Sequence, residues 1–227
     1  MDPGSRPPGK GAHNRMLPIG DDNSGRRTLP VVTYALIAAN VLFFLVELAG
    51  GDDFVTAWSF VPARFLANPA ADFATVFTSM FMHAGWLHLG GNMLYLWIFG
   101  DNVEDRFGHL QYLAFYLVCG IAATFAQLAF STGSGIPSLG ASGAIAGVLG
   151  AYVLLFPGRR VTVATGYGIA EMPSLVVIGL WFVLQLFSGI GSIGAAADTG
   201  GVAFMAHVGG FITGFVLALV IRGDRVA

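Results

Sequence analysis

Apolar residues gather along this chain in six long runs, separated by short polar or turn-forming segments. A helix needs about 20 residues to cross a bilayer, and each run approaches that length. The pattern therefore predicts an all-α membrane protein whose six transmembrane helices form one bundle over residues 30–227. The predicted spans are 29–48, 78–100, 110–130, 139–157, 173–191 and 202–221.

Two segments refine this division. Residues 1–29 are rich in Pro, Gly, Arg and Asp and lack apolar periodicity, which is typical of a disordered tail. The first apolar run is too long for the core of a cleaved signal peptide. Farther along, residues 107–158 contain no Asp, Glu, Lys or Arg, yet STGSGIPSLG at 131–140 supplies a turn. That stretch is therefore expected to form two helices rather than one.

Basic residues predict the orientation, because Lys and Arg remain preferentially in cytoplasmic loops. With a cytoplasmic N-terminus, Arg64 is the only one of the 11 Lys and Arg residues that falls on the outer side. Both termini, including the tail at 1–29, are therefore expected in the cytoplasm. The shortness of this tail favours a bacterial inner membrane over an organelle.

Composition agrees with a membrane protein and excludes several other classes. Hydrophobic residues make up 55% of the 227 and charged residues only 11%, whereas about a quarter of a soluble domain is charged. The net charge of -2 leaves no basic face for a nucleic acid. The single cysteine, Cys119, cannot form an internal disulfide. The sequence gives no indication of an oligomeric state.

The predicted topology brings polar side chains from three spans to one depth. The second, fourth and sixth spans all run inward, and at 1.5 Å per residue Ser142 and His207 would lie roughly 5 to 10 Å below the outer surface. Hydrocarbon disfavours polar groups without partners, so such a set calls for a functional reason. Its members are Ser142, His207, His83, His88 and Asn92.

Ser142 and His207 have the chemistry of a nucleophile and its general base. A serine hydroxyl attacks efficiently only when a base within hydrogen-bond reach takes its proton, and histidine is the usual base. Small residues continue the helix face of each, and such stripes let membrane helices approach closely. After the serine these are Ala146 and Gly150, and after the histidine they are Gly210 and Gly214.

The second span offers hydrogen-bond donors for a developing negative charge. His88 and Asn92 are four residues apart, so they share a helix face and can point toward one oxyanion. Helix geometry would turn His83 roughly 140° away from His88, and we expect it to brace a loop. The nearest carboxylate to the sixth span is Asp198, which falls in the preceding loop. A serine and histidine dyad without a third member is the simplest interpretation.

Four motifs in order resemble the rhomboid family of intramembrane serine proteases. They are FMHAGWLHLGGNM at 81–93, GDNVEDRFGH at 100–109, GASGAIAG at 140–147 and AHVGGFITG at 206–214. The resemblance covers about residues 30–222 and implies a six-helix rhomboid-like bundle. It also implies a hydrolase that needs no cofactor, and that acts on single-span membrane proteins within the lipid bilayer near the outer face.

Site roles follow from the same resemblance. Ser142 would be the nucleophile and His207 the base, while His88, Asn92 and the backbone N–H of Ser142 would hold the oxyanion. The resemblance also implies that Glu104 and Arg106 stabilise the turn after the second span. Residues expected to support the site structurally are His83, Gly140, Gly143, Gly210 and Gly214.

Two further features concern the surroundings of the site. The family resemblance implies that substrates arrive between the second and fifth spans, where Trp181 and Phe182 could close the opening. Some family members carry an aromatic residue one turn after the serine, where it stacks on the histidine. This chain has Ala146 at that position, so His207 must be positioned by other contacts.

Other functions fit the sequence less well. A catalytically inactive relative that binds transmembrane clients is the main alternative, but such proteins typically lose the serine or the histidine. A transporter or channel would favour inverted repeats or charged residues in mid-span, and neither is evident. A zinc protease would require HExxH, so no metal is expected. An aspartyl protease would require two intramembrane carboxylates, and Glu47 at the end of its span lacks a partner.

Overall fold

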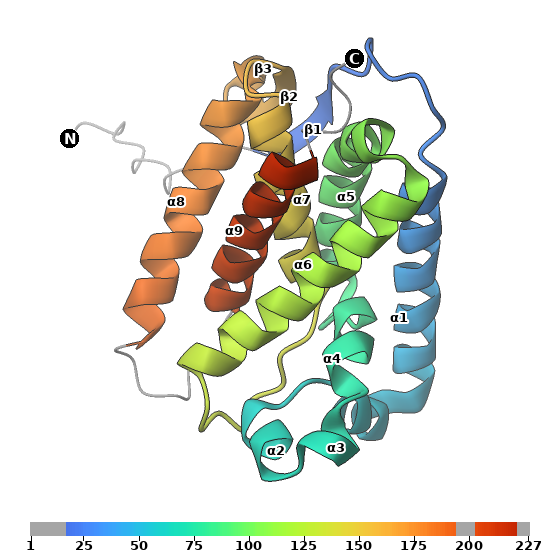
Figure 1. Cartoon of the computed structure of the whole chain (residues 1–227), viewed down its shortest axis with the longest axis vertical. Helices are drawn as coiled ribbons and strands as arrows, with labels where there is room; N and C mark the ends of the chain where they lie inside the picture. The colour runs from blue at the N-terminus through green and yellow to red at the C-terminus, as the bar shows by residue number, and fades with distance from the viewer. Residues whose placement is uncertain (1–16, 194–202, 222–227) are drawn as a thin grey trace, which may run out of the picture.

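Helices dominate the computed structural model, which describes residues 17–193 and 203–221 (Figure 1). The long helices are α1 (Val31–Trp58), α5 (Trp86–Phe107), α6 (His109–Phe130), α7 (Ser142–Leu155), α8 (Ser174–Ile193) and α9 (Phe204–Ile221). Shorter turns between α1 and α5 are α2 (Pro62–Ala67), α3 (Pro69–Asp72), α4 (Thr75–Thr78) and the 3-10 helix η1 (Ser79–Phe81). The strands are β1 (Leu17–Asp21), β2 (Arg160–Thr165) and β3 (Gly168–Pro173).

The long helices follow the six predicted apolar runs in order. By length and composition, α1, α6 and α9 are each able to cross a membrane. The apolar stretches of α7 and α8 are shorter, and α5 ends in charged residues. The six-span count therefore stays a prediction. Residue 202, where the sixth span was expected to begin, lies outside the described residues, as do both chain ends.

The second predicted span begins later than expected. Residues 78–85 do not continue the helix toward the outer end, because η1 and an extended segment precede Trp86. Gly85 has a φ of 155°, and its carbonyl accepts the backbone N–H of Leu89 at 3.0 Å as α5 begins. Apolar composition runs through this break, so hydrophobicity alone could not locate it.

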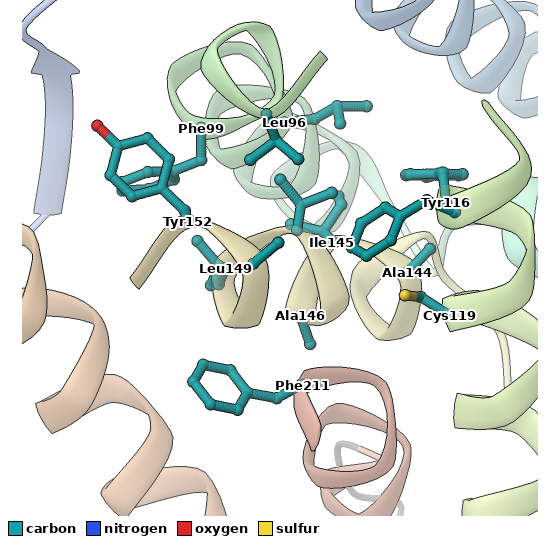
Figure 2. Close-up of a cluster of buried hydrophobic side chains, with 14 of the residues drawn as sticks. Leu96, Phe99, Tyr116, Cys119, Ala144, Ile145, Ala146, Leu149, Tyr152 and Phe211 are labelled. Carbon is teal, nitrogen blue, oxygen red and sulfur yellow. The ribbon is translucent and has the colours of Figure 1, made fainter. Parts of the chain in front are cut away.

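Helix α7 lies at the centre of the bundle. Every residue from Gly143 to Val153 is buried. Side chains from α5, α6 and α9 surround it, among them Leu96, Tyr116 and Phe211 (Figure 2). A helix enclosed on all sides by protein meets no lipid, so its length of 14 residues is not set by the bilayer.

The backbones of α7 and α9 touch at glycine positions. A Cβ atom on Gly150 would collide with the carbonyl oxygen of Phe211, and one on Gly210 with that of Gly143. Gly214 lies equally close to the carbonyl oxygen of Gly147. Only residues without a side chain permit this separation, which sets how far apart groups on the two helices can lie.

The expectation of a disordered tail at 1–29 is wrong for residues 17–29. β1 pairs antiparallel with β2, Leu17 opposite Ala164 and Asp21 opposite Val161, and β2 pairs with β3. Cross-strand hydrogen bonds supply the order that the polar composition did not predict. Residues 1–16 lie outside the described residues.

Asp21 joins this small sheet to the helices. Its carboxylate accepts hydrogen bonds from the Tyr152 hydroxyl at 2.6 Å and from the Asn102 amide at 2.8 Å. Burial raises the pKa of Asp21 from 3.8 to about 6, and the negative charge of Asp101 acts in the same direction. The sheet is thus attached at the ends of α5 and α7 through an acid that titrates near neutral pH.

Replacing Gly150 with alanine should destabilise the bundle. The added methyl must displace the α9 backbone, and overpacking of this kind costs about 1–3 kcal/mol in the free energy of unfolding. Gly179→Ala in α8 is the matched control, because open space surrounds that position. Unfolding titrations in mixed detergent micelles measure both. Equal stability of the two variants would contradict contact between the α7 and α9 backbones.

Attachment of β1 should strengthen on acidification. The pKa of Asp21 is higher in the folded state than the usual 3.8, so the folded state binds the proton more tightly and loses this stability as the pH rises through about 6. We expect hydrogen-exchange protection factors of the Leu17–Asp21 amides to increase roughly tenfold from pH 7 to pH 5. This figure takes into account that solvent screens the partly exposed Asp21 side chain. Asp21→Asn should remove this dependence, and its persistence would assign it to another group.

Candidate active site

Ser142 is held at the first position of α7 by the turn that precedes it. Gly140 has a φ of 131°, a conformation that side chains rarely adopt, and its N–H donates to the Ser79 carbonyl at 2.8 Å. A Cβ atom on Gly140 would lie 2.9 Å from the His88 ring. The turn therefore directs the chain into α7 and leaves room for His88 beside the serine.

Ser142 and His207 meet across the α7–α9 contact. The Nε2 atom of His207 lies 2.7 Å from the Ser142 Oγ atom, within hydrogen-bond range. His207 is buried near the beginning of α9, while Ser142 is half-buried. The glycine-mediated packing described above brings together two side chains that are 65 residues apart in sequence.

The other ring nitrogen of His207 meets a residue that sequence reasoning missed. Its Nδ1 atom lies 2.8 Å from Oε1 of Gln185 on α8. The Trp181 ring lies nearby, with its centroid 5.9 Å from that of the imidazole. An amide in the middle of an apolar run was the available signal for Gln185. The carboxylate considered at sequence level, Asp198, lies outside the described residues.

A cavity of about 670 Å³ opens beside this pair. Its walls include both Ser142 and His207, together with His88 and Asn92 from the first turns of α5. The Asn92 Nδ2 atom is buried and has no hydrogen-bond partner among the described residues. The Nδ1 atom of His88 accepts the Ala84 N–H at 3.3 Å. Asn92, whose amide donor is unused, is therefore a wall residue of the same cavity as the serine.

His83 lies in the segment before α5, so the helical angle expected between it and His88 does not apply. Its buried ring packs edge-on against His88, with centroids 5.2 Å apart, and also against Phe44. The backbone N–H of His83 donates to the Glu47 carboxylate at 2.9 Å. Glu47 is thus bound by backbone rather than by a second carboxylate, and it fixes the loop that supports His88.

Glu104 performs a similar task at the other end of α5. Its buried carboxylate accepts the backbone N–H groups of Val32 and Thr33 at 2.8 and 2.7 Å. The His109 ring nitrogen lies 2.6 Å from the same side chain. These contacts join the beginning of α1, the end of α5 and the beginning of α6.

Comparison with known proteins places this chain in a family. The rhomboid domain family matches residues 70–224. Rhomboid protease GluP of Bacillus subtilis (strain 168) is 33% identical over 193 residues, which cover 83% of this chain and 34% of that protein. Rhomboid protein 1, mitochondrial, of Saccharomyces cerevisiae is 29% identical over 191 residues, covering 81% and 51% respectively.

A vertebrate relative is also similar. Presenilin-associated rhomboid-like protein A, mitochondrial, of Danio rerio is 30% identical over 149 residues, which cover 60% of this chain and 39% of that protein. The chain thus spans between 34% and 51% of the lengths of these three curated relatives. Its apolar helices and site geometry define an integral membrane protein in which a half-buried serine contacts a buried histidine. The chain belongs to the rhomboid family.

Removal of the Glu47 carboxylate should loosen the segment that carries His83. Glu47→Ala leaves the buried N–H of His83 without an acceptor, which costs about 1–3 kcal/mol in the free energy of unfolding. Glu47→Gln retains an acceptor oxygen and should lose less. Detergent unfolding titrations compare the two variants, and equal losses would show that the hydrogen bond to His83 is unimportant.

Proposed function

We propose that this protein is an intramembrane serine endopeptidase that cleaves transmembrane segments of other membrane proteins near the outer face of the membrane. The proposal rests chiefly on the 2.7 Å contact between Ser142 Oγ and His207 Nε2 at the wall of a cavity. Membership of the rhomboid family, which includes a relative named as a protease, supports it.

The chemistry requires a proton to move as the serine attacks. His207 Nε2 takes the Ser142 hydroxyl proton while Oγ bonds to the carbonyl carbon of the scissile peptide. The imidazolium then gives that proton to the leaving amine, and the C–N bond breaks. Water, activated by the same imidazole, hydrolyses the acyl-serine ester and restores the free hydroxyl.

Donors for the tetrahedral oxyanion come from two helices. The first backbone N–H groups of α7, including that of Ser142, have no partner within the helix, and the helix dipole favours negative charge there. Asn92 contributes its buried Nδ2, and His88 contributes a ring N–H from the same face of α5. Such preorganised donors are typically the largest source of rate enhancement in acyl transfer.

The shortness of the central helix supports a position of the serine below the membrane surface. Fourteen residues of α7 extend about 21 Å, against roughly 30 Å of hydrocarbon. Arg159 and Arg160 follow its C-terminal end and favour a cytoplasmic position for that end, which also agrees with cytoplasmic termini in a bacterial inner membrane. Ser142 then lies roughly 9 Å below the outer surface, and the cavity gives water a route to it.

The cavity wall indicates the class of substrate. Apolar side chains predominate around the serine, including Leu87, Ile145 and Trp181, and these fit residues of a membrane-spanning segment. A peptide bond in a stable helix is shielded, so we expect substrates to carry small or helix-breaking residues near the outer surface. Phe182 stacks on Phe211 at 4.2 Å, which holds α8 against α9 rather than against α5, where the substrate is expected to arrive.

Ser142→Ala and His207→Ala should each lower cleavage of a single-span substrate by at least about 10⁴-fold, because each removes half of the proton-transfer pair. Ser188→Ala, an exposed serine on α8, is the matched control and should cleave normally. The measurement uses purified protein in detergent or vesicles, with cut sites located by mass spectrometry.

A fluorophosphonate probe gives a second readout of the same pair. We expect it to label Ser142 in the wild type and to fail when His207 is replaced. Undiminished cleavage by Ser142→Ala would eliminate the serine mechanism. Binding of transmembrane segments by a wild-type protein that never cuts them would instead favour the inactive rhomboid-like alternative.

A further inference from the structure

We infer that Gln185 is the positioning residue of the site: its side-chain oxygen accepts a hydrogen bond from His207 Nδ1 and thereby fixes which nitrogen faces Ser142. The inference rests on the proposed function. Its structural basis is the pair of contacts on opposite sides of one imidazole, 2.8 Å to Gln185 Oε1 and 2.7 Å to Ser142 Oγ.

Because of the hydrogen-bonding capacity of a neutral imidazole, this pair of contacts determines which ring nitrogen of His207 carries the proton. One ring nitrogen carries a proton and the other a lone pair. An amide oxygen only accepts, so Nδ1 facing Gln185 Oε1 must carry the proton. Nε2 is then left with the lone pair, and it is the atom that faces the Ser142 hydroxyl. Gln185 thus selects the tautomer that can act as a base.

No other described side chain performs this task. No Asp or Glu among residues 17–193 and 203–221 hydrogen-bonds to His207, and Ala146 is too small to hold the ring by stacking. Trp181 contacts the imidazole only through its ring, at an interplanar angle of 40°. The amide is therefore the sole polar partner of Nδ1 in the described part of the chain.

The position of Gln185 on α8 follows from helix periodicity. Trp181, Phe182 and Gln185 lie on the face of α8 that packs toward α9, since Gln185 follows Trp181 by four residues and Phe182 by three. Leu184, one residue away, is exposed. Gln185 is the only one of these three side chains that carries a hydrogen-bond acceptor, because the Trp181 indole only donates. A neutral amide also avoids the cost of burying a carboxylate among apolar groups.

The experiment compares two replacements of similar length. Gln185→Met removes the strong acceptor and should lower kcat about tenfold with KM nearly unchanged, because the loss falls on orientation of the base. Gln185→Glu retains an acceptor oxygen and should keep kcat within about threefold of the wild type. Gln111→Met, at an exposed position on α6, controls for the substitution itself.

The tautomer provides a readout that a merely structural role would not move. Nitrogen NMR of histidine-labelled protein, with His207→Ala used for assignment, should show the proton on Nδ1 of His207 in the wild type. Gln185→Met should shift the population toward the Nε2–H form, whereas Gln185→Glu should not. If Gln185→Met fails to fold, the wild-type spectrum alone decides, because a proton on Nε2 overturns the inference.

Kinetic outcomes separate this inference from the proposed function. Normal kcat in Gln185→Met would overturn the role of Gln185. Equal losses of kcat in the Met and Glu variants with an unchanged tautomer would do the same. Neither result would contradict the proposed protease function. Cleavage that survives in His207→Ala would instead remove the protease mechanism. The wild-type tautomer would still report whether Gln185 orients the ring.

Discussion

The contact between the α7 and α9 backbones is the constraint on which the rest of the structure depends. A serine side chain is short, so it reaches an imidazole on another helix only if the two helices nearly touch. Gly147 and Gly150 on α7, with Gly210 and Gly214 on α9, leave no side chain between the backbones. The large side chains of α7, such as Ile145, Leu149 and Tyr152, pack in the same core as large side chains from α5 and α6.

Buried carboxylates hold the flanking helices around that centre. Glu47 on α1 accepts a backbone N–H just before α5, and Glu104 on α5 accepts two backbone N–H groups at the beginning of α1. The two helices are thus joined at both ends by acids that accept backbone N–H groups. In an apolar environment such donors satisfy a carboxylate with no need for a second buried charge.

Sequence reasoning located the long helices because apolar runs of that length have few alternatives, and it found Ser142 and His207 because motifs mark both. It missed the β2–β3 hairpin, although Val161 and Val163 alternate there as buried residues, since short strands beside long helices give a weak signal. The contact of Gln185 with His207 was beyond reach, because it depends on how α8 rotates against α9. The break before α5 is set by the backbone at Gly85 and by Glu47, which is 36 residues away from its partner in the chain.

For the proposed protease, the isolation of α7 from lipid would have a consequence for where a substrate is cut. Because protein encloses α7, the height of Ser142 is fixed relative to the bundle, whereas a client helix slides to match the thickness of its host bilayer. In a thicker membrane, a different peptide bond of the client helix would lie level with the Ser142 hydroxyl. The position of the proposed cut would therefore depend on both the protein and the lipid composition around it.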